Sequence, residues 1–205
     1  MHKLNRKFYR KSALDLSKDL LGKYLIFNKN NKKFITKIVE VEAYMGENDK
    51  ASHTYKNKRT KRTETMFKDA GHAYVYLIYG IYNCLNVVSG DKNIPQGVLL
   101  RGVQPINELD TISLNRFGKK YHELTKSQIK NLTNGPGKLT QAFGITRDIN
   151  GYDLTGDIIY ICEGEKEQFE IIESKRIGIN YAEEAKDFLW RFYIADSDYV
   201  SKKIK

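Results

Sequence analysis

Two glutamates stand two residues apart in a strand-like segment, Phe34–Ala43. Because side chains alternate between the faces of a strand, Glu40 and Glu42 are predicted to share one face with Ile38 and Tyr44. Two carboxylates in line can form an acid/base pair when burial or the neighbouring charge keeps one protonated. The alternative is a solvent-facing edge on which both are hydrated. Tyr44 and a turn follow directly, so the strand ends where a rigid frame meets a cleft, which favours a catalytic Glu42.

A tyrosine-rich hairpin is the second candidate. Its four tyrosines fall within nine residues, on both strands and at the turn: Tyr74, Tyr76, Tyr79 and Tyr82. Core packing explains any one of them, but the set predicts a platform for nucleobases, with each stacked base contributing about 1–3 kcal/mol. Tyr79, beside Gly80 at the turn, is placed to wedge between base pairs. Asn86, further along, is either hydrogen-bonded in the core or reads a base edge, and the sequence leaves both open.

Positive charge gathers in one segment. The 205 residues carry 35 Lys and Arg against 25 Asp and Glu, a net charge of +10. This balance suits a polyanionic partner, although the codons of an AT-rich genome also enrich lysine. Seven basic side chains face one acid, Glu64, between positions 50 and 68: Lys50, Lys56, Lys58, Arg59, Lys61, Arg62 and Lys68. We predict that this basic segment binds phosphates.

Several classes of site are not indicated. The four histidines are scattered, and no CxxC, HxxxH, Walker, GxGxxG or GxSxG pattern occurs, so neither a metal nor a cofactor is expected. Gly135–Lys138 could hold a phosphate at a helix start or form a plain tight turn. Cys84 and Cys162 are too few for a disulfide framework and are expected to be reduced and buried. With no membrane-length apolar run and no secretory signal, a cytoplasmic protein is expected.

The predicted elements form a single α+β domain over residues 1–205. A helix from Ser12 to Leu21 is capped by Ser12 and stopped by Gly22. Further helices are predicted over Ile106–Asn115, Thr125–Asn131 and Gly137–Phe143, and strands over Lys23–Phe27, Phe34–Ala43, Ala73–Tyr79, Tyr82–Val88, Gly97–Arg101, Asp157–Ile161 and Arg191–Ala195. This pattern predicts a curved antiparallel β-sheet with flanking helices and a protruding tyrosine-rich β-hairpin.

An ordered set of motifs resembles the alkyladenine, or 3-methyladenine, DNA glycosylase family. The matching segments run in order from about Leu20 to Ile194: Glu40–Gly46, Ala51–His53, Met66–Phe67, Gly71–Gly80 continuing to Asn86, Gly97–Arg101, Gly135–Leu139, Arg176–Gly178 and Arg191–Tyr193. The segment Tyr55–Lys61 departs from the family pattern, because it is richer in lysine and lacks the expected glycine and proline. The ordered combination is far more specific than any single motif.

The resemblance implies a pocket for a flipped base. Glu42 resembles the general base that activates water. The walls that stack on the base are implied at Tyr44, His53 and Tyr76, with Ala51 also in contact with substrate and His53 bonded to the base edge. Asn86 resembles the residue that clashes with the amino group of guanine. Arg101 resembles a pocket-side residue near Glu42 and the DNA backbone.

The resemblance also implies a DNA-binding surface. Tyr79 resembles the wedge that fills the gap in the duplex. Thr60, Arg62 and Met66 fall where the family contacts DNA, and the basic segment adds Lys58.

The implied activity is monofunctional DNA glycosylase activity in base excision repair. A monomer is expected to flip alkylated or deaminated purines (3-methyladenine, 7-methylguanine, hypoxanthine or ethenoadenine) out of double-stranded DNA and to hydrolyse the N-glycosidic bond without a cofactor. Two alternatives stay open. A non-catalytic nucleic-acid-binding module would share every feature except Glu42, and a bifunctional glycosylase–lyase would form a Schiff base through a lysine.

Overall fold

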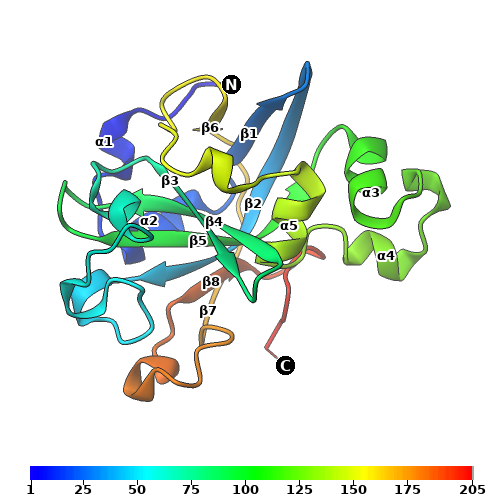
Figure 1. Ribbon diagram of the computed structural model, residues 1–205. Coiled ribbons are helices and arrows are strands. Elements are labelled where there is room, and N and C mark those ends of the chain that lie inside the picture. The colour runs from blue at the N-terminus through cyan, green and yellow to red at the C-terminus, as the bar shows by residue number, and fades with distance from the viewer. Residues whose placement is uncertain (205) are drawn as a thin grey trace.

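The computed structural model describes residues 1–204 and is built on one antiparallel sheet (Figure 1). Its strands are β1 (Tyr24–Lys29), β2 (Lys32–Tyr44), β3 (Ala73–Ile78), β4 (Tyr82–Ser89), β5 (Gln96–Pro105), β6 (Ile159–Cys162), β7 (Ile171–Ser174) and β8 (Arg191–Ile194). The sheet order is β3-β4-β5-β2-β1-β6, and β8 pairs with both β2 and β7. The predicted α+β fold with a curved antiparallel sheet is confirmed.

The helices are short and flank the sheet. They are α1 (Arg6–Tyr9), α2 (Ala13–Leu20), α3 (Leu109–Phe117), α4 (Lys126–Lys130) and α5 (Pro136–Phe143). Single 3₁₀ turns occur at Gly46–Asn48, Tyr55–Asn57, Glu64–Phe67, Tyr121–Glu123, Arg147–Ile149 and Glu183–Asp187. As predicted, Ser12 caps α2: its hydroxyl oxygen accepts the Asp15 N–H at 3.1 Å.

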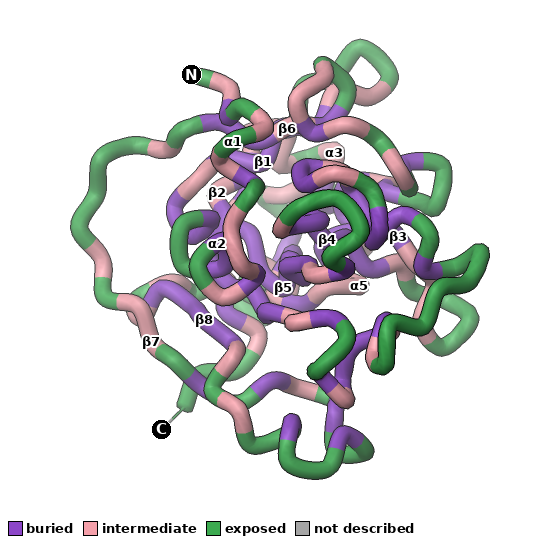
Figure 2. The backbone as a smooth tube through the Cα atoms, turned by 90° about the vertical axis from the view of Figure 1, so that its left-hand side faces the viewer, coloured by how far each residue is buried: buried purple, intermediate pink, exposed green. Residues whose placement is uncertain are grey.

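The core lies between the sheet and its helices. Leu16 and Leu20 of α2, Val41 of β2 and Phe143 of α5 belong to one buried cluster. Each fully buried side chain of this kind contributes roughly 1.5–3 kcal/mol. Figure 2 shows buried stretches along the central strands and exposed ones on the outer loops. The central strands therefore form a rigid frame, and loops at its edge carry the variable surface.

A β-bulge interrupts β2 at the first glutamate. The pairing of β2 with β5 shifts between Ile38 and Glu40 and again between Glu40 and Val41. A bulge adds a residue and changes which face the following side chains occupy. Ile38 accordingly packs in the main core cluster together with Val39 and Val41. The prediction that Ile38 shares the face of the carboxylates is therefore wrong.

Tertiary pairing moved several element boundaries. The strand predicted over Gly97–Arg101 extends to Pro105, because the added residues pair with Thr36–Glu40 of β2. The helix predicted from Ile106 begins only at Leu109, because Ile106 N–H still donates to the Ile35 carbonyl at 2.9 Å. Neither α1 nor β7 was predicted from the sequence.

Candidate active site

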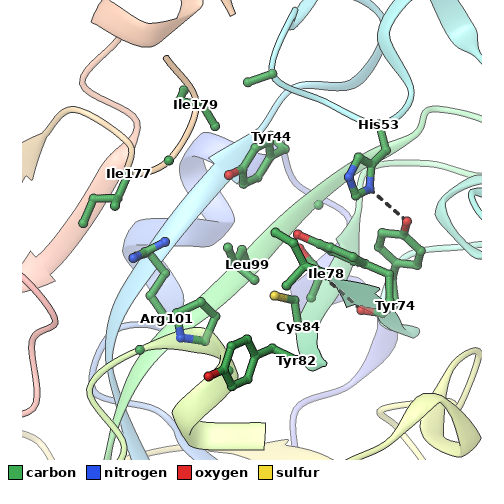
Figure 3. A pocket seen from close by; sticks show the side chains of 18 of the residues that line it. Tyr44, His53, Tyr74, Ile78, Tyr82, Cys84, Leu99, Arg101, Ile177 and Ile179 are labelled. Carbon is green, nitrogen blue, oxygen red and sulfur yellow. Dashed lines mark hydrogen bonds between the residues drawn. The ribbon is translucent and has the colours of Figure 1, made fainter. Parts of the chain in front are cut away.

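A cavity of about 630 Å³ lies where β2–β5 meet the loops that follow β2 and β7. This volume falls within the range of small-molecule sites, about 300–1,000 Å³. All six predicted substrate-binding residues line it: Tyr44, Ala51, His53, Tyr76, Asn86 and Arg101. Figure 3 shows Tyr44, His53, Cys84 and Arg101 directed toward the same space. Side chains that are far apart in the sequence thus meet at one cavity.

Aromatic rings form one wall of the cavity. The ring of His53 lies edge-on to that of Tyr76, with centroids 4.6 Å apart, and Tyr74 and Tyr76 are 5.4 Å apart. His53 Nδ1 is 3.1 Å from the Tyr74 hydroxyl (Figure 3). The Arg62 guanidinium lies 5.2 Å above the Tyr76 ring and 3.5 Å from His53 Nε2. Burial, and then the charge of Arg62, lower the pKa of His53 to about 4, so the His53 ring is uncharged at neutral pH.

Glu42 lies just behind the cavity wall. The side chain is 0% exposed and is not itself among the lining residues. The three residues that it contacts, Tyr44, Arg101 and Ile177, do line the cavity. Oε1 accepts the Ile177 N–H at 2.7 Å and lies 3.3 Å from Arg101 Nη1; Oε2 accepts the Tyr44 hydroxyl at 2.9 Å. Since Glu40 is also 0% exposed, the alternative of two hydrated carboxylates on a solvent-facing edge is excluded.

Two partners of Glu42, Tyr44 and Arg101, keep the protons with which they bind its carboxylate. Burial, and then the Glu42 carboxylate, raise the pKa of Tyr44 well above its usual range, so the hydroxyl keeps its proton. Burial opposes the charge of Arg101, but the carboxylates of Glu42 and Glu40 outweigh it and raise the pKa of Arg101. A carboxylate oxygen can accept two hydrogen bonds, and Oε2 has one donor. Glu42 thus retains acceptor capacity on the oxygen shared with Tyr44.

A buried ion pair that the sequence did not reveal braces this arrangement. Arg176 Nη1 and Nη2 bind the two oxygens of Asp49 at 2.5 and 2.8 Å, and both side chains are 0% exposed. The guanidinium lies between the rings of Tyr44, at 4.8 Å, and Trp190, at 4.9 Å. It therefore fixes a cavity wall and also places the next residue, Ile177, whose N–H reaches Glu42. The matched motif Arg176–Gly178 marked this segment without indicating its role.

Asn86 has a fixed orientation within the cavity. It is 6% exposed, and its Nδ2 donates to the Tyr74 carbonyl at 3.1 Å. The alternative in which Asn86 is hydrogen-bonded in the interior is therefore confirmed, and the same side chain also lines the cavity.

The hairpin turn carries the most exposed aromatic ring at the cavity mouth. Tyr79 is 79% exposed, and both Tyr79 (φ +53°) and Gly80 (φ +74°) have left-handed backbones. The Ile81 N–H donates to the Ile78 carbonyl at 3.3 Å and closes the turn. A left-handed tyrosine is rare and strained. The strand predicted over Ala73–Tyr79 ends at Ile78, and the ring of Tyr79 joins the rim of the same cavity.

The basic segment presents less free charge than its composition predicts. Lys50 pairs with Glu183 and Glu184 at 2.6 and 2.8 Å. The two glutamates stand more than 130 positions away, where no local pattern signals them.

Other members of the segment are divided between surface and cavity. Arg59 binds Glu64 at 2.6 Å. In the described part of the chain, the exposed Lys58 and Lys61 have no carboxylate partner. Thr60 bonds to Thr63 near them. Met66, by contrast, is buried and lines the cavity rather than the outer surface.

Other expectations concerned metals, cysteines and membranes. Residues 1–204 contain no group of three or more His, Cys, Asp or Glu side chains able to hold a metal ion. Cys84 and Cys162 are free and buried, as predicted. No helix formed by residues 1–204 is long and apolar enough to cross a bilayer.

Gly135–Lys138 begins α5 and lines the cavity, with Lys138 Nζ bonded to Asn131 and Asn134 at 2.7 and 2.8 Å.

Comparison with known proteins places this geometry in a family. Residues 7–198 match the family described as methylpurine-DNA glycosylase. A relative from Clostridium novyi, named "Putative 3-methyladenine DNA glycosylase", is 57% identical over 99% of this chain and 100% of its own length. Relatives with the same name in Clostridioides difficile and Clostridium acetobutylicum are 53% and 54% identical, over 93% and 97% of this chain and 100% and 97% of their own lengths. The chain therefore belongs to the methylpurine-DNA glycosylase family.

Proposed function

We propose that the protein, acting as a monomer, flips alkylated or deaminated purines out of duplex DNA and hydrolyses their N-glycosidic bonds with a water activated by Glu42. One observation carries the proposal: an aromatic cavity backs onto a buried carboxylate that is held by three groups lining the same cavity. Flipping a base costs a few kcal/mol, and least for a damaged or mispaired base, so damaged bases enter most readily.

The aromatic wall offers rings on which a flipped purine can stack. A purine alkylated on a ring nitrogen carries positive charge, which the face of an aromatic ring attracts, although Arg176 and Arg62 already lie over the rings of Tyr44 and Tyr76. His53, with its pKa lowered to about 4, adds no opposing charge at neutral pH. Asn86, fixed by the Tyr74 carbonyl, supplies a rigid polar group that clashes with the amino group of a normal guanine.

The chemistry follows from how charge develops. Breaking the glycosidic bond leaves an oxocarbenium-like sugar, which a nearby carboxylate stabilises. Glu42 accepts a proton from the attacking water, and the oxygen of that water bonds to the sugar carbon as the purine leaves. An alkylated purine departs as a neutral base, whereas hypoxanthine needs protonation. Tyr44 and Arg101 keep Glu42 aimed at the cavity.

The direct test uses duplexes that each carry one modified purine. The purified protein is incubated with DNA containing 7-methylguanine, ethenoadenine or hypoxanthine, and abasic sites are then cleaved with alkali. Strand breaks at the modified position are expected, together with the free base. If none of the duplexes is cut although the protein binds them, the non-catalytic binding module becomes the better description.

The lyase alternative has a separate test. Among residues 1–204, Lys138 is the only lysine that lines the cavity, and two asparagine oxygens hold its Nζ. A monofunctional hydrolase forms no Schiff base, so borohydride should trap no covalent complex with lesion DNA. A trapped complex that disappears in Lys138→Met would identify a lyase.

A further inference from the structure

Glu40 is fully buried beside the active site, yet the proposed reaction does not use it. Oε1 accepts bonds from Ser201 Oγ at 2.7 Å, Arg191 Nη1 at 2.8 Å and Arg101 Nε at 3.3 Å. Oε2 accepts the Ser201 N–H at 2.7 Å. Gly102 closes the remaining side, because a Cβ built there would lie only 3.2 Å from Oε2. Of the residues that contact Glu40 only Arg101 lines the cavity, whereas all three partners of Glu42 do, so Glu40 is not assigned as a second base.

The contacts of Glu40 converge on Arg101. One edge of the guanidinium faces Glu40 through Nε and the other faces Glu42 through Nη1, each at 3.3 Å. With Arg191, the four side chains form a charge-balanced buried cluster of two carboxylates and two guanidinium groups. Removing one member of such a cluster leaves an uncompensated charge. Without Glu40, Arg101 would pair with Glu42 alone and occupy the oxygens that must accept a proton.

Ser201 holds this cluster from a segment far along the chain. Its N–H and its hydroxyl both donate to Glu40, and its Oγ also lies 3.4 Å from Arg101 Nη2. The neighbouring Lys202 carbonyl accepts from Arg191 Nη1 at 2.8 Å. Ser201 thus contacts both Glu40 and Arg101, while neither Ser201 nor Glu40 borders the cavity.

We infer that Glu40 and Ser201 are positioning residues that hold Arg101 on the side away from the cavity. Its guanidinium then orients Glu42 without occupying the oxygens that must accept a proton. This inference rests on the proposed function. The two glutamates of β2 then have different roles: Glu42 accepts the proton from water, and Glu40 holds Arg101, which orients Glu42.

The variant Ser201→Ala tests the anchor, because it removes one donor and leaves the backbone bond. Single-turnover release of 7-methylguanine should slow by about 10-fold, the change expected when one orienting hydrogen bond is removed. Binding of duplex with an uncleavable analogue should stay within about twofold. Ser201→Thr, which keeps the hydroxyl, should restore the rate. Ser113→Ala is the matched control, because the Ser113 hydroxyl likewise donates one bond of 2.7 Å, to the Leu109 carbonyl.

A second readout does not depend on activity. Hydrogen exchange at Arg101 Nε–H, followed by NMR, should accelerate in Ser201→Ala and in Glu40→Gln. Exchange at Arg116 Nε–H, which donates to the Leu132 carbonyl, should not change in either variant. Wild-type excision in Ser201→Ala together with unaltered exchange at Arg101 would overturn the inference. Absence of purine release by the wild-type protein would instead refute the proposed function, while the exchange comparison would still decide whether Glu40 and Ser201 anchor Arg101.

Discussion

The carboxylate centre (Glu40, Glu42 and Arg101) reaches the cavity through Arg101, and the hairpin turn (residues 78–81) reaches it through Ile78 and Tyr79, but the two are built in opposite ways. In the centre both carboxylates are 0% exposed and every charge has an opposite partner. In the turn, Tyr79 and Ile81 are 79% and 68% exposed, and the space around Gly80 is open. The groups proposed for chemistry are thus fixed before DNA binds, whereas the ring of the proposed wedge, Tyr79, is exposed to solvent.

This contrast has an energetic meaning. Segments with few buried contacts open locally at low free-energy cost, while buried networks open only when much of the fold does. A wedge residue must move from water into the gap between stacked base pairs. Contacts between its ring and the rest of the protein would oppose that movement. A general base must keep its geometry to within a fraction of an ångström, so internal contacts help it.

The largest expected effect comes from breaking the centre. Glu42→Gln keeps the size of the side chain and an acceptor for the Ile177 N–H, but its amide cannot take the proton of water. Single-turnover excision should fall by at least about 100-fold, while lesion binding survives. Glu47→Gln, an exposed neighbour, serves as the control. Excision near the wild-type rate in Glu42→Gln would remove the base from the mechanism.

At the hairpin turn, a substitution should impair excision from duplex DNA and leave the stability of the fold almost unchanged. Tyr79→Ala removes an exposed ring, so it should change the free energy of unfolding by less than about 0.5 kcal/mol. Excision from duplex should slow by about 10-fold, because nothing fills the vacated stack. The defect should shrink when the target purine lies in a bulge or single strand. A large fall in melting temperature, absent in the control Tyr152→Ala, would show that Tyr79 stabilises the fold instead.

The wall between these regions should respond to acid through His53. Its pKa is lowered from 6.5 to about 4 in the folded protein, so between these values the unfolded chain binds the proton more readily. Stability is therefore full above pH 6.5 and falls as the pH drops toward 4. Relative to His53→Gln, the wild type should lose about 1–2 kcal/mol over this window, after allowance for solvent screening. Denaturant titrations of the wild type and His53→Gln that give the same difference in stability at pH 7 and at pH 4.5 would contradict a lowered pKa of His53.

The smallest effect is expected at the outer surface. Replacing the exposed Lys58 and Lys61 by Ala should reduce the salt dependence of binding to undamaged duplex by about 0.9 in log–log slope for each phosphate that the protein no longer neutralises. Lys166→Ala, in the segment between β6 and β7, should leave the slope unaltered. An unchanged slope in the double variant would show that these lysines are only solvated.

Local patterns predicted the parts of the site that depend on local geometry. Strand alternation placed Tyr74 and Tyr76 together, and Glu42 with Tyr44, because each pair lies two residues apart. The same rule failed at Ile38, where a bulge intervenes. Alternation is a property of regular strands, so it carries no information across such irregularities.

The groups that orient Glu42 could not be predicted in this way. Ile177, Arg176 and Ser201 contact residues of β2 or its following loop from more than 120 positions away. Their partners are chosen by how β8 and its neighbours dock on β2, which is a tertiary event. Family resemblance marked Arg176–Gly178 and Arg191–Tyr193 but gave no role, and nothing in the local sequence around Ser201 signals a buried carboxylate.

The distance between Glu40 and Ser201 also bears on how the molecule assembles. The bonds that join them span 161 residues, and contacts of such separation form late because a long loop must close first. Until then the bulged strand carries two acidic groups that cannot enter the interior without a large desolvation penalty. We expect the outer hairpins to form early during refolding, with the carboxylates still hydrated. Catalytic competence would then be the last property that the chain acquires.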